Sequence, residues 1–144
     1  MDRATVSILI KRSALIFDKR ANQLLAPHQL TGSQFRILMT LYHSPACSVR
    51  QTDVETMFSM TNPTVTGLVD KLERRRLVAR VSNPNDKRSK LLVLTDHAEE
   101  QRAEFLALAG AIEAEMTAGL TDAEIELLSG LLQKVIDRHL ADTP

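Results

Sequence analysis

The sequence has little cysteine, few aromatic residues and no long hydrophobic run. Cys47 is its one cysteine, which excludes an internal disulfide and agrees with a cytoplasmic location. The longest run of large aliphatic residues is LLVL at positions 91–94, far below the roughly 20 residues that span a bilayer. The opening stretch, MDRATVSILIKR, alternates charges with short apolar segments, and no secretory signal is visible in it. We therefore expect a cytoplasmic protein with no membrane association.

Sequence motifs of enzymes are missing as well. The chain has no Gly-rich phosphate loop, no GxSxG and no pair of carboxylates in an apolar context. We therefore predict no enzymatic activity, no catalytic residue and no cofactor. Aromatic residues make up 3% of the chain and none stands among the cations, which argues against the stacking of single-stranded RNA bases.

Metal binding and redox sensing have one candidate each. Asp96, His97 and Glu100 share one helical turn, but acids at a helix start are explained by the helix dipole, so no metal site is predicted. Cys47 has no cation immediately beside it, since Arg50 is three residues away in a turn. We interpret it as a structural or incidental thiol in preference to a redox sensor.

Charge is segregated along a chain whose formal net charge is zero. Residues 62–95 carry eight Lys/Arg and three Asp/Glu, a net charge of +5, whereas residues 96–144 carry three against eleven, a net charge of −8. Solvated helix faces alone are one explanation. A basic segment beside an acidic helical segment also indicates a basic working surface, which suits a nucleic acid.

Capping residues and apolar spacing predict a mainly helical chain. Thr31–Gln34 and Thr121–Glu124 fit the capping box, Thr95 precedes acids, and Thr61 precedes a proline, as at helix starts. A further helix is expected over roughly residues 4–24. The apolar stripes at helical spacing are Phe35, Leu38, Met39 and Tyr42; Val65, Leu68, Val69 and Leu72; Phe105, Leu108, Ile112 and Met116; and Ile125, Leu128, Leu132, Val135 and His139.

Only one region is predicted to form strands. Residues 78–82 and 90–94 flank the turn-forming stretch NPND, which predicts a two-stranded hairpin. The predicted order is helix, helix, short helix, helix, hairpin, long helix, helix. Residues 50–58 and 61–75, joined by a tight connection, have the spacing of a helix-turn-helix. A basic hairpin directly after it indicates a winged helix.

The open face of helix 61–75 and the hairpin carry side chains suited to double-stranded DNA. Short polar residues in the first helical turn suit base edges, and cations further along suit phosphates. Cations on the hairpin raise the affinity for DNA, because they release counterions from the phosphates. An arginine at the tip of the hairpin fits a narrow minor groove. Asp86 is placed to orient the guanidinium of Arg88. The predicted DNA-binding residues are Thr61, Asn62, Thr64, Thr66, Lys71, Arg74, Asp86, Lys87, Arg88 and Lys90.

The block TNPTVTGLVDKLERRRLVARVSNPNDKRSKLLVLT, with LTGSQFRILMTLYHSP upstream, resembles the multiple-antibiotic-resistance regulator (MarR) family of winged-helix transcription factors. The resemblance covers most of the chain. It implies one domain over residues 1–144, in which helices at about 1–25 and 96–144 build a homodimer and residues 31–95 form the DNA-binding part. It also implies a ligand-responsive repressor acting on a palindromic operator. By motif position, the recognition helix holds Thr61, Asn62, Thr64 and Thr66, and the wing holds Asp86 and Arg88.

Four positions depart from the family pattern. Ser59 and Arg76 stand where glycine is usual, the first near the helix–helix turn and the second after the recognition helix. Glu55 replaces a small residue near that turn, and Ala98 replaces a glycine shortly after the hairpin. These departures concern loop geometry and leave the predicted fold unchanged.

A small-molecule effector, bound between the dimerisation helices and the winged helix, is the input that the resemblance implies. The residues that suit such a cleft are Phe17, His28, Tyr42 and Met57, and core packing explains each of them equally well. The alternative function is a winged-helix module for protein–protein interaction without specific DNA binding. The basic segment and the wing arginine argue against it, since such a module does not need them.

Overall fold

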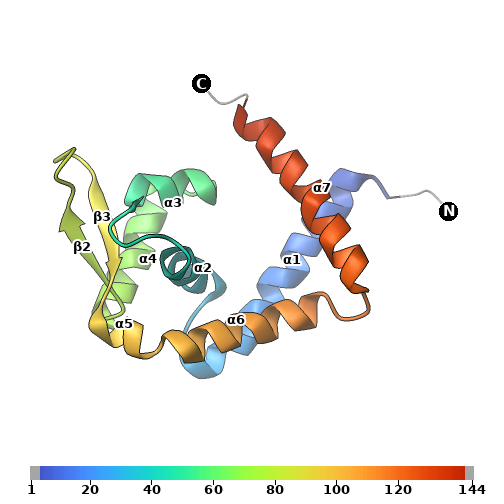
Figure 1. The fold of residues 1–144 in the computed structure, drawn as a ribbon, viewed down its shortest axis with the longest axis horizontal. Helices are drawn as coiled ribbons and strands as arrows, with labels where there is room; N and C mark the ends of the chain where they lie inside the picture. The colour runs from blue at the N-terminus through green and yellow to red at the C-terminus, as the bar shows by residue number, and fades with distance from the viewer. Residues whose placement is uncertain (1–3, 142–144) are drawn as a thin grey trace. The chain divides into compact units, whose positions relative to one another are not determined.

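The computed structural model describes residues 4–141 and has the predicted fold class, a mainly helical chain with a small antiparallel sheet (Figure 1). Two compact units, Met1–Gly110 and Ala111–Pro144, make up the chain. The elements are α1 (Val6–Leu25), η1 (Ala26–His28), α2 (Gly32–Tyr42), β1 (Val49–Arg50), α3 (Gln51–Met57), α4 (Asn62–Arg74), β2 (Val78–Ser82), β3 (Lys90–Leu94), α5 (Asp96–Glu100), α6 (Arg102–Met116) and α7 (Asp122–Ala141).

Threonine residues begin four of the helices, as predicted. Thr31 and Thr121 form capping boxes, in which each hydroxyl accepts a hydrogen bond from the amide three residues on, at 3.3 and 3.2 Å. In return, Gln34 and Glu124 accept from the threonine amides at 3.1 and 2.9 Å. The hydrogen bonds with the Thr121 backbone and side chain lower the pKa of Glu124. The remaining two caps are Thr61 and Thr95, whose hydroxyls accept from the third amide of their helices.

The strands β1, β3 and β2 form an antiparallel sheet with β3 in the centre. The pairing of β2 with β3 is the predicted hairpin, with Val78 opposite Leu94. β1 adds a strand, so the expectation of only two strands was wrong. Val49 of β1 pairs with Leu92 of β3. A strand of two residues is too short to produce an alternating pattern, so its pairing partner alone defines it.

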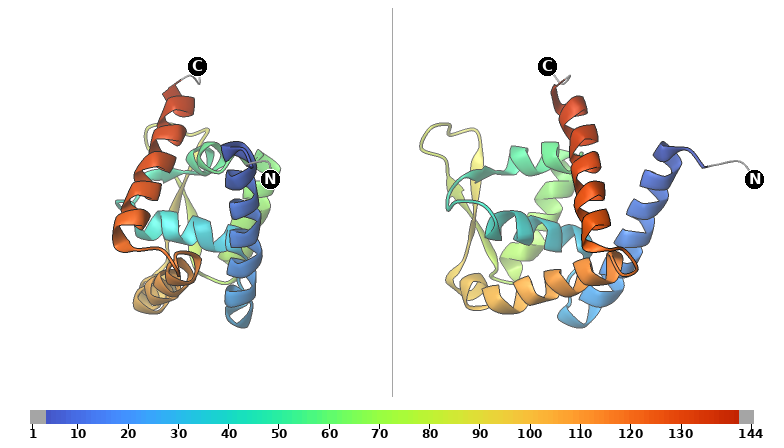
Figure 2. Two further views of the ribbon diagram at one scale, coloured as in Figure 1. Left: turned by 90° about the vertical axis from the view of Figure 1, so that its right-hand side faces the viewer. Right: turned by 45° about the vertical axis from the view of Figure 1, so that its right-hand side comes forward.

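The core of the first unit lies where α2 and α4 pack against each other and against the sheet. The helices α2, α3 and α4 gather on one side of the sheet (Figures 1 and 2). Val65 and Val69 are fully buried, so the predicted stripe of α4 faces inward. The rings of Phe35 and Tyr42 on α2 each lie 6.3 Å from the ring of Phe105 on α6. These contacts join the start of α6 to the winged helix.

The helix that follows the hairpin is divided into α5 and α6 at Gln101, so the prediction of one long helix was wrong. The carbonyl oxygen of Ala98 accepts hydrogen bonds from the Tyr42 hydroxyl at 2.5 Å and from the amide of Gln101 at 3.1 Å. A side chain inserted at a helical carbonyl interrupts the ladder. Burial raises the pKa of Tyr42 to about 12, so its hydroxyl remains a donor at neutral pH.

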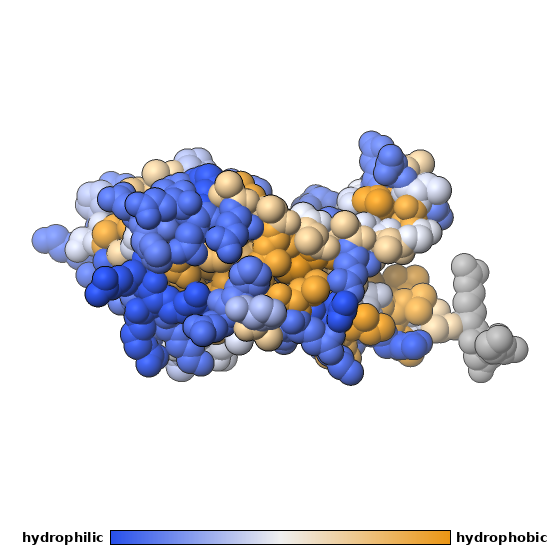
Figure 3. All heavy atoms as spheres, turned by 90° about the horizontal axis from the view of Figure 1, so that it is seen from below, coloured by the Kyte–Doolittle hydropathy of each residue, from blue (hydrophilic) through white to orange (hydrophobic). Residues whose placement is uncertain are grey.

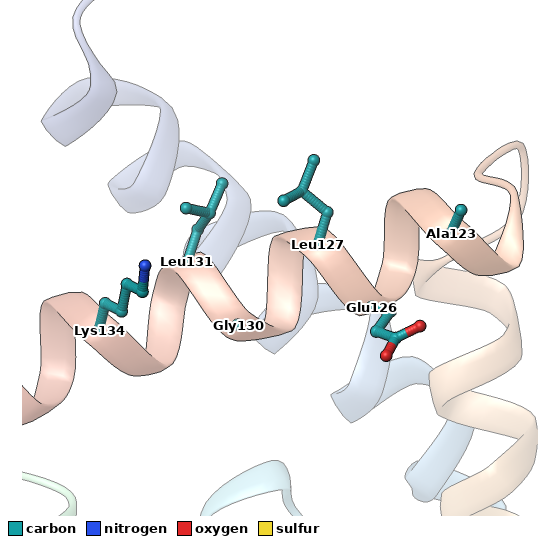
Figure 4. A pocket seen from close by; sticks show the side chains of 6 residues that line it. All are labelled: Ala123, Glu126, Leu127, Gly130, Leu131 and Lys134. Carbon is teal, nitrogen blue, oxygen red and sulfur yellow. The ribbon is translucent and has the colours of Figure 1, made fainter.

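The first and last helices expose many large apolar side chains. Val6 and Ile16 on α1 are 70% and 58% exposed. On α7, apolar exposed residues lie beyond the predicted stripe: Leu127, Leu131, Ile136 and Leu140. At 3.6 residues per turn, the apolar residues of α7 cover more than half of its circumference. An open hollow of about 360 Å³ lies on this helix, where Leu127 and Leu131 project to the same side (Figure 4).

Hydrophilic and hydrophobic residues are unevenly spread over the surface. On the face drawn in Figure 3, hydrophilic residues dominate at the left, and hydrophobic residues reach the surface toward the middle. Among residues 4–141, no helix combines the length and the apolar character that crossing a membrane requires.

Candidate nucleic-acid interface

The helices α3 and α4 form the helix-turn-helix, and a residue in the left-handed conformation makes the turn between them. Ser59 has a φ of 52°. The amide of Met60 donates to the carbonyl of Glu55 at 2.9 Å, and the amide of Ser59 donates to that of Thr56 at 3.4 Å. This pair of hydrogen bonds is the Schellman motif, which ends a helix at a left-handed residue. The serine therefore adopts the conformation for which glycine was expected.

The recognition helix α4 ends in the same way. Arg76 has a φ of 58°, its amide donates to the carbonyl of Glu73 at 2.8 Å, and the amide of Leu77 donates to that of Leu72 at 3.0 Å. Leu72 and Leu77 are buried, and apolar residues at these two positions commonly accompany this motif. The turn directs the chain from α4 into β2.

The first turn of α4 presents short polar side chains at the surface. Thr61, Asn62 and Thr64 are all exposed. The hydroxyl of Thr61 donates to that of Thr64 at 2.9 Å, and Nδ2 of Asn62 donates to the carboxylate of Glu55 at 3.3 Å. Lys71 and Arg74, further along the helix, are exposed as well.

Thr66 differs from the other candidates on this helix because it is half-buried. Its hydroxyl accepts a hydrogen bond from Nε2 of Gln51, at the start of α3, at 2.9 Å. Its carbonyl accepts from Nη2 of Arg80, on β2, at 3.0 Å. These contacts hold Thr66 against neighbouring elements of the protein.

Arg80 joins the hairpin to the recognition helix, a role that the sequence reasoning missed. Its Nη1 atom lies 2.9 Å from the carboxylates of both Asp70 and Glu73, and its side chain is only 20% exposed. In the sequence, this arginine is distinguished only as one of the eight cations of the basic segment 62–95. The available signal was weak: two acids three residues apart on one helix and a cation in the following strand.

Asn83 organises the tip of the wing, although the sequence marked it only as a turn residue. It is 8% exposed. Its Oδ1 atom accepts from the amide of Asn85 at 3.0 Å, and its Nδ2 atom donates to the hydroxyl of Ser89 at 3.0 Å. An asparagine side chain bonded in this way fixes a turn. A hydrogen-bonded loop therefore carries the basic residues of the wing.

Asp86 acts on the backbone of Arg88. Its Oδ1 atom accepts from the Arg88 amide at 2.9 Å, whereas the predicted partner was the Arg88 guanidinium. The side chains of Lys87, Arg88 and Lys90 are exposed, and none of these three cations forms an ion pair within the described part of the chain. The wing therefore presents unpaired positive charge on an ordered loop.

The four candidates for an effector cleft lie in different environments. Phe17 is half-buried on α1. His28 has its Nδ1 atom 3.7 Å from the carboxylate of Glu104, Tyr42 is buried at the α5–α6 break, and Met57 is 57% exposed. The hydrogen bonds, ion pairs and ring contacts of the described residues join no two of these four side chains.

The metal and redox candidates, Asp96, His97, Glu100 and Cys47, are exposed. Among residues 4–141, no group of three His, Cys, Asp or Glu is placed to hold a metal ion. A ring nitrogen of His97 lies 2.8 Å from the side-chain amide of Gln101. Cys47 is exposed, with a φ of 57°.

This arrangement has the chemistry of a surface for double-helical nucleic acid. A helix fits the major groove, and hydroxyls and amides in its first turn hydrogen-bond to base edges. Exposed cations on the same helix and on the wing are suited to hydrogen bonds with phosphates. Because Arg80 is paired with Asp70 and Glu73 inside the fold, the positive charge of this surface comes from the other cations.

Known proteins with similar sequences and structures include DNA-binding proteins. The MarR family model matches residues 28–89. The chain is 31% identical to the multiple antibiotic resistance protein MarR of Escherichia coli (strain K12) over 120 residues, 83% of this chain and 82% of that protein. The structure matches the S. aureus MepR–DNA complex with a TM-score of 0.77 and 26% identity, over 94% of this chain and 99% of that one. It also matches BpsR of Bordetella bronchiseptica, whose DNA binding is regulated by 6-hydroxynicotinic acid, with a TM-score of 0.76 and 27% identity, over 97% and 95% of the two chains.

Proposed function

The chain belongs to the MarR family of transcriptional regulators, and from this premise we propose that it is a homodimeric, ligand-responsive repressor that binds a palindromic operator in double-stranded DNA. Membership of this family also confirms the prediction that the chain is not an enzyme. One observation carries the proposal. An exposed polar first turn of α4 is combined with a wing whose three cations have no acidic partner among residues 4–141.

The proposed contacts follow from these exposures. Thr61, Asn62 and Thr64 bond to base edges in the major groove, and Lys71 and Arg74 bond to phosphates. Arg88 enters the minor groove, flanked by Lys87 and Lys90 on the backbone. Thr66 supports the helix from behind through Gln51, and Asp86 places Arg88 through its amide. MepR, which has a similar fold, forms a complex with DNA, and this supports the assignment.

The proposed homodimer is supported by the exposed apolar side chains of α1 and α7. A helix with apolar residues over more than half of its circumference needs burial on two sides, and a second copy related by two-fold symmetry can supply the cover. We assign residues 1–25 and 96–144 to dimerisation and residues 31–95 to DNA binding. Two-fold symmetry then places the half-site centres about 10 bp apart.

The proposed effector is a small organic molecule, and BpsR, which is regulated by such a molecule, supports this part. Phe17, His28 and Met57 remain candidates for contact with it. Tyr42 remains a candidate as well, although its hydroxyl is already bonded to Ala98. A ligand that reaches this hydroxyl has to compete with that hydrogen bond.

Selection of bound fragments from the source genome, followed by footprinting, tests the proposal. We expect one enriched imperfect palindrome at moderate salt, protected over two half-sites. If no sequence is enriched, the proposal is wrong and the alternative, a winged helix that binds proteins only, takes its place.

A further inference from the structure

Glu55 places a negative charge beside the recognition helix. Its Oε2 atom accepts a hydrogen bond from Nδ2 of Asn62, the first residue of α4, at 3.3 Å. Its backbone carbonyl accepts from the amide of Met60 within the turn, so the last turn of α3 fixes the position from which the side chain extends. The helix dipole of α4 favours a carboxylate at this end.

A carboxylate at this place has a cost for DNA binding. It adjoins the exposed turn formed by Thr61, Asn62 and Thr64, where it repels phosphates of any sequence. A small residue was expected at this position from the family pattern. A charge of this kind costs affinity for every sequence, but it raises specificity if it costs more affinity for the wrong sequence than for the right one.

We propose that Glu55 is a positioning residue that sets base specificity through Asn62. This inference rests on the proposed DNA-binding function. The Asn62 amide has two N–H donors and one acceptor oxygen, and its bond to Glu55 fixes which side of the amide carries the nitrogen. Among the described residues, Oδ1 of Asn62 accepts no hydrogen bond. The oxygen and the second N–H are therefore both available to a base.

The base that matches this pair of groups is adenine. Its N6 amine donates and its N7 atom accepts in the major groove, and an asparagine amide satisfies both together. Guanine presents two acceptors at the same edge, and the carboxylate of Glu55 repels them. The fixed amide of Asn62 and the negative charge of Glu55 thus both favour adenine over guanine.

The neighbouring hydroxyls do not provide this selectivity. Thr61 and Thr64 are bonded to each other at 2.9 Å, and a hydroxyl rotates to donate or accept as its partner requires. Asn62 is therefore the residue in this turn whose donor and acceptor have fixed places.

The test compares Glu55→Ala with Glu55→Gln on duplexes selected from a random library by the unmodified protein. The base pair read by Asn62 is identified as the one whose preference Asn62→Ala removes. At that pair each of the four bases is then tested by fluorescence anisotropy. Glu100→Gln, on α5, removes one exposed negative charge per protomer and is the matched control. Thermal unfolding followed by circular dichroism establishes that each variant is folded.

We expect adenine at this pair. Glu55→Ala should reduce the preference for adenine about tenfold, within the range of discrimination by one bidentate pair, and should strengthen binding to unselected sequences several-fold. Glu55→Gln should strengthen that binding equally but keep most of the preference, because its amide oxygen still accepts from Asn62. Combined with Asn62→Ala, Glu55→Ala should change the preference no further. Glu100→Gln should leave the preference unaltered.

Three results would overturn the inference and leave the proposed function intact. They are a preferred base other than adenine, an unchanged preference in Glu55→Ala, and a further change in preference when Glu55→Ala is added to Asn62→Ala. If the unmodified protein selects no sequence at all, the proposed function fails and this inference fails with it.

Discussion

At the scale of single residues, left-handed backbone conformations mark the joints of the DNA-binding part. Gln29, Cys47, Ser59 and Arg76 have φ values between 52° and 58°, a region that costs a residue with a Cβ atom about 1–2 kcal/mol. Two of these joints were indicated by the sequence, because glycine was expected at Ser59 and Arg76. Gln29 and Cys47 gave no such signal, since their conformation depends on the packing of the segments that they connect.

Replacing Ser59 by glycine should stabilise the protein. Glycine adopts the left-handed conformation without strain, which raises the free energy of unfolding. The greater conformational freedom of glycine in the unfolded chain lowers it by a smaller amount. The net increase in the free energy of unfolding should be about 0.5–1 kcal/mol. Urea unfolding measures it. Ser59→Ala keeps the Cβ atom and is the control. If the alanine variant is as stable as the glycine variant, the left-handed conformation of Ser59 costs no free energy and the prediction is wrong.

Arg88 is the residue of the wing for which we predict the largest effect on DNA binding. Arg88→Ala should weaken operator binding by about 1–3 kcal/mol and leave the free energy of unfolding nearly unchanged, because the side chain is exposed. The dependence of log K on log salt should become less steep by about one unit for each phosphate that the variant no longer binds. Anisotropy titrations at several salt concentrations measure both quantities.

Two neighbours separate a specific role of Arg88 from diffuse charge. Lys87→Ala removes the adjacent exposed cation and should matter less. Asp86→Ala should give an intermediate loss, because the Arg88 amide loses its bond to the Asp86 carboxylate while the arginine remains. Equal small effects of Arg88→Ala and Lys87→Ala would show that the wing contributes only general attraction.

At the scale of secondary-structure elements, the sequence predicted the pieces better than their connections. Capping residues and apolar periodicity are local signals, and they located α2 and α4. The helix α3 was predicted from its spacing to α4. The contacts between elements are not local. Tyr42 reaches Ala98 across 56 positions, and the guanidinium of Arg75, directly after α4, donates to the carbonyl of Gln29 across 46. The division of α5 from α6 depends on the first of these contacts and was therefore missed.

Arg80 connects β2 to α4 through two ion pairs and a hydrogen bond, and its removal should affect both stability and DNA binding. Arg80→Ala deletes two ion pairs and a hydrogen bond to the Thr66 carbonyl, and it leaves Asp70 and Glu73 without their cation. We expect the free energy of unfolding to fall by about 1–3 kcal/mol, as for hydrogen bonds to charged groups. Operator binding should weaken as well, because the hairpin is no longer held against α4.

Arg74→Ala is the matched control for Arg80→Ala. Arg74 is an exposed cation on α4, so its loss should weaken DNA binding with little change in thermal stability. Calorimetry and anisotropy on the two variants distinguish the roles. If Arg80→Ala unfolds at the same temperature as the unmodified protein, the network does not hold the hairpin in place.

At the scale of the whole molecule, charge and apolar surface are divided between the DNA-binding part and the terminal helices. Residues 62–95 have a net charge of +5 and residues 96–144 a net charge of −8. In the proposed complex with DNA, the acidic segment 96–144 therefore does not compete with the wing for phosphates. The sequence predicted one apolar stripe on α7, and the structure shows exposed apolar residues on both sides of it. An apolar stripe in a sequence predicts that a helix packs on one side. The full width of the apolar surface of α7 is recognised only once the structure shows which of its apolar residues stay exposed.

The dimer can be tested with a pair of substitutions on this helix. Leu128 and Leu132 are 46% and 38% exposed within one chain, so the double variant Leu128→Lys, Leu132→Lys should fold but sediment as a monomer. Operator affinity should then fall by a factor of about 10²–10⁴, because the second half-site is no longer bound by a linked partner. Deletion of residues 121–144 should have the same two effects.

Gln133→Lys is the matched control, since Gln133 already contacts Asp137 through its amide and a lysine can pair with that carboxylate. A double variant that still sediments as a dimer places the interface elsewhere, and a monomer with full operator affinity removes the need for a palindrome.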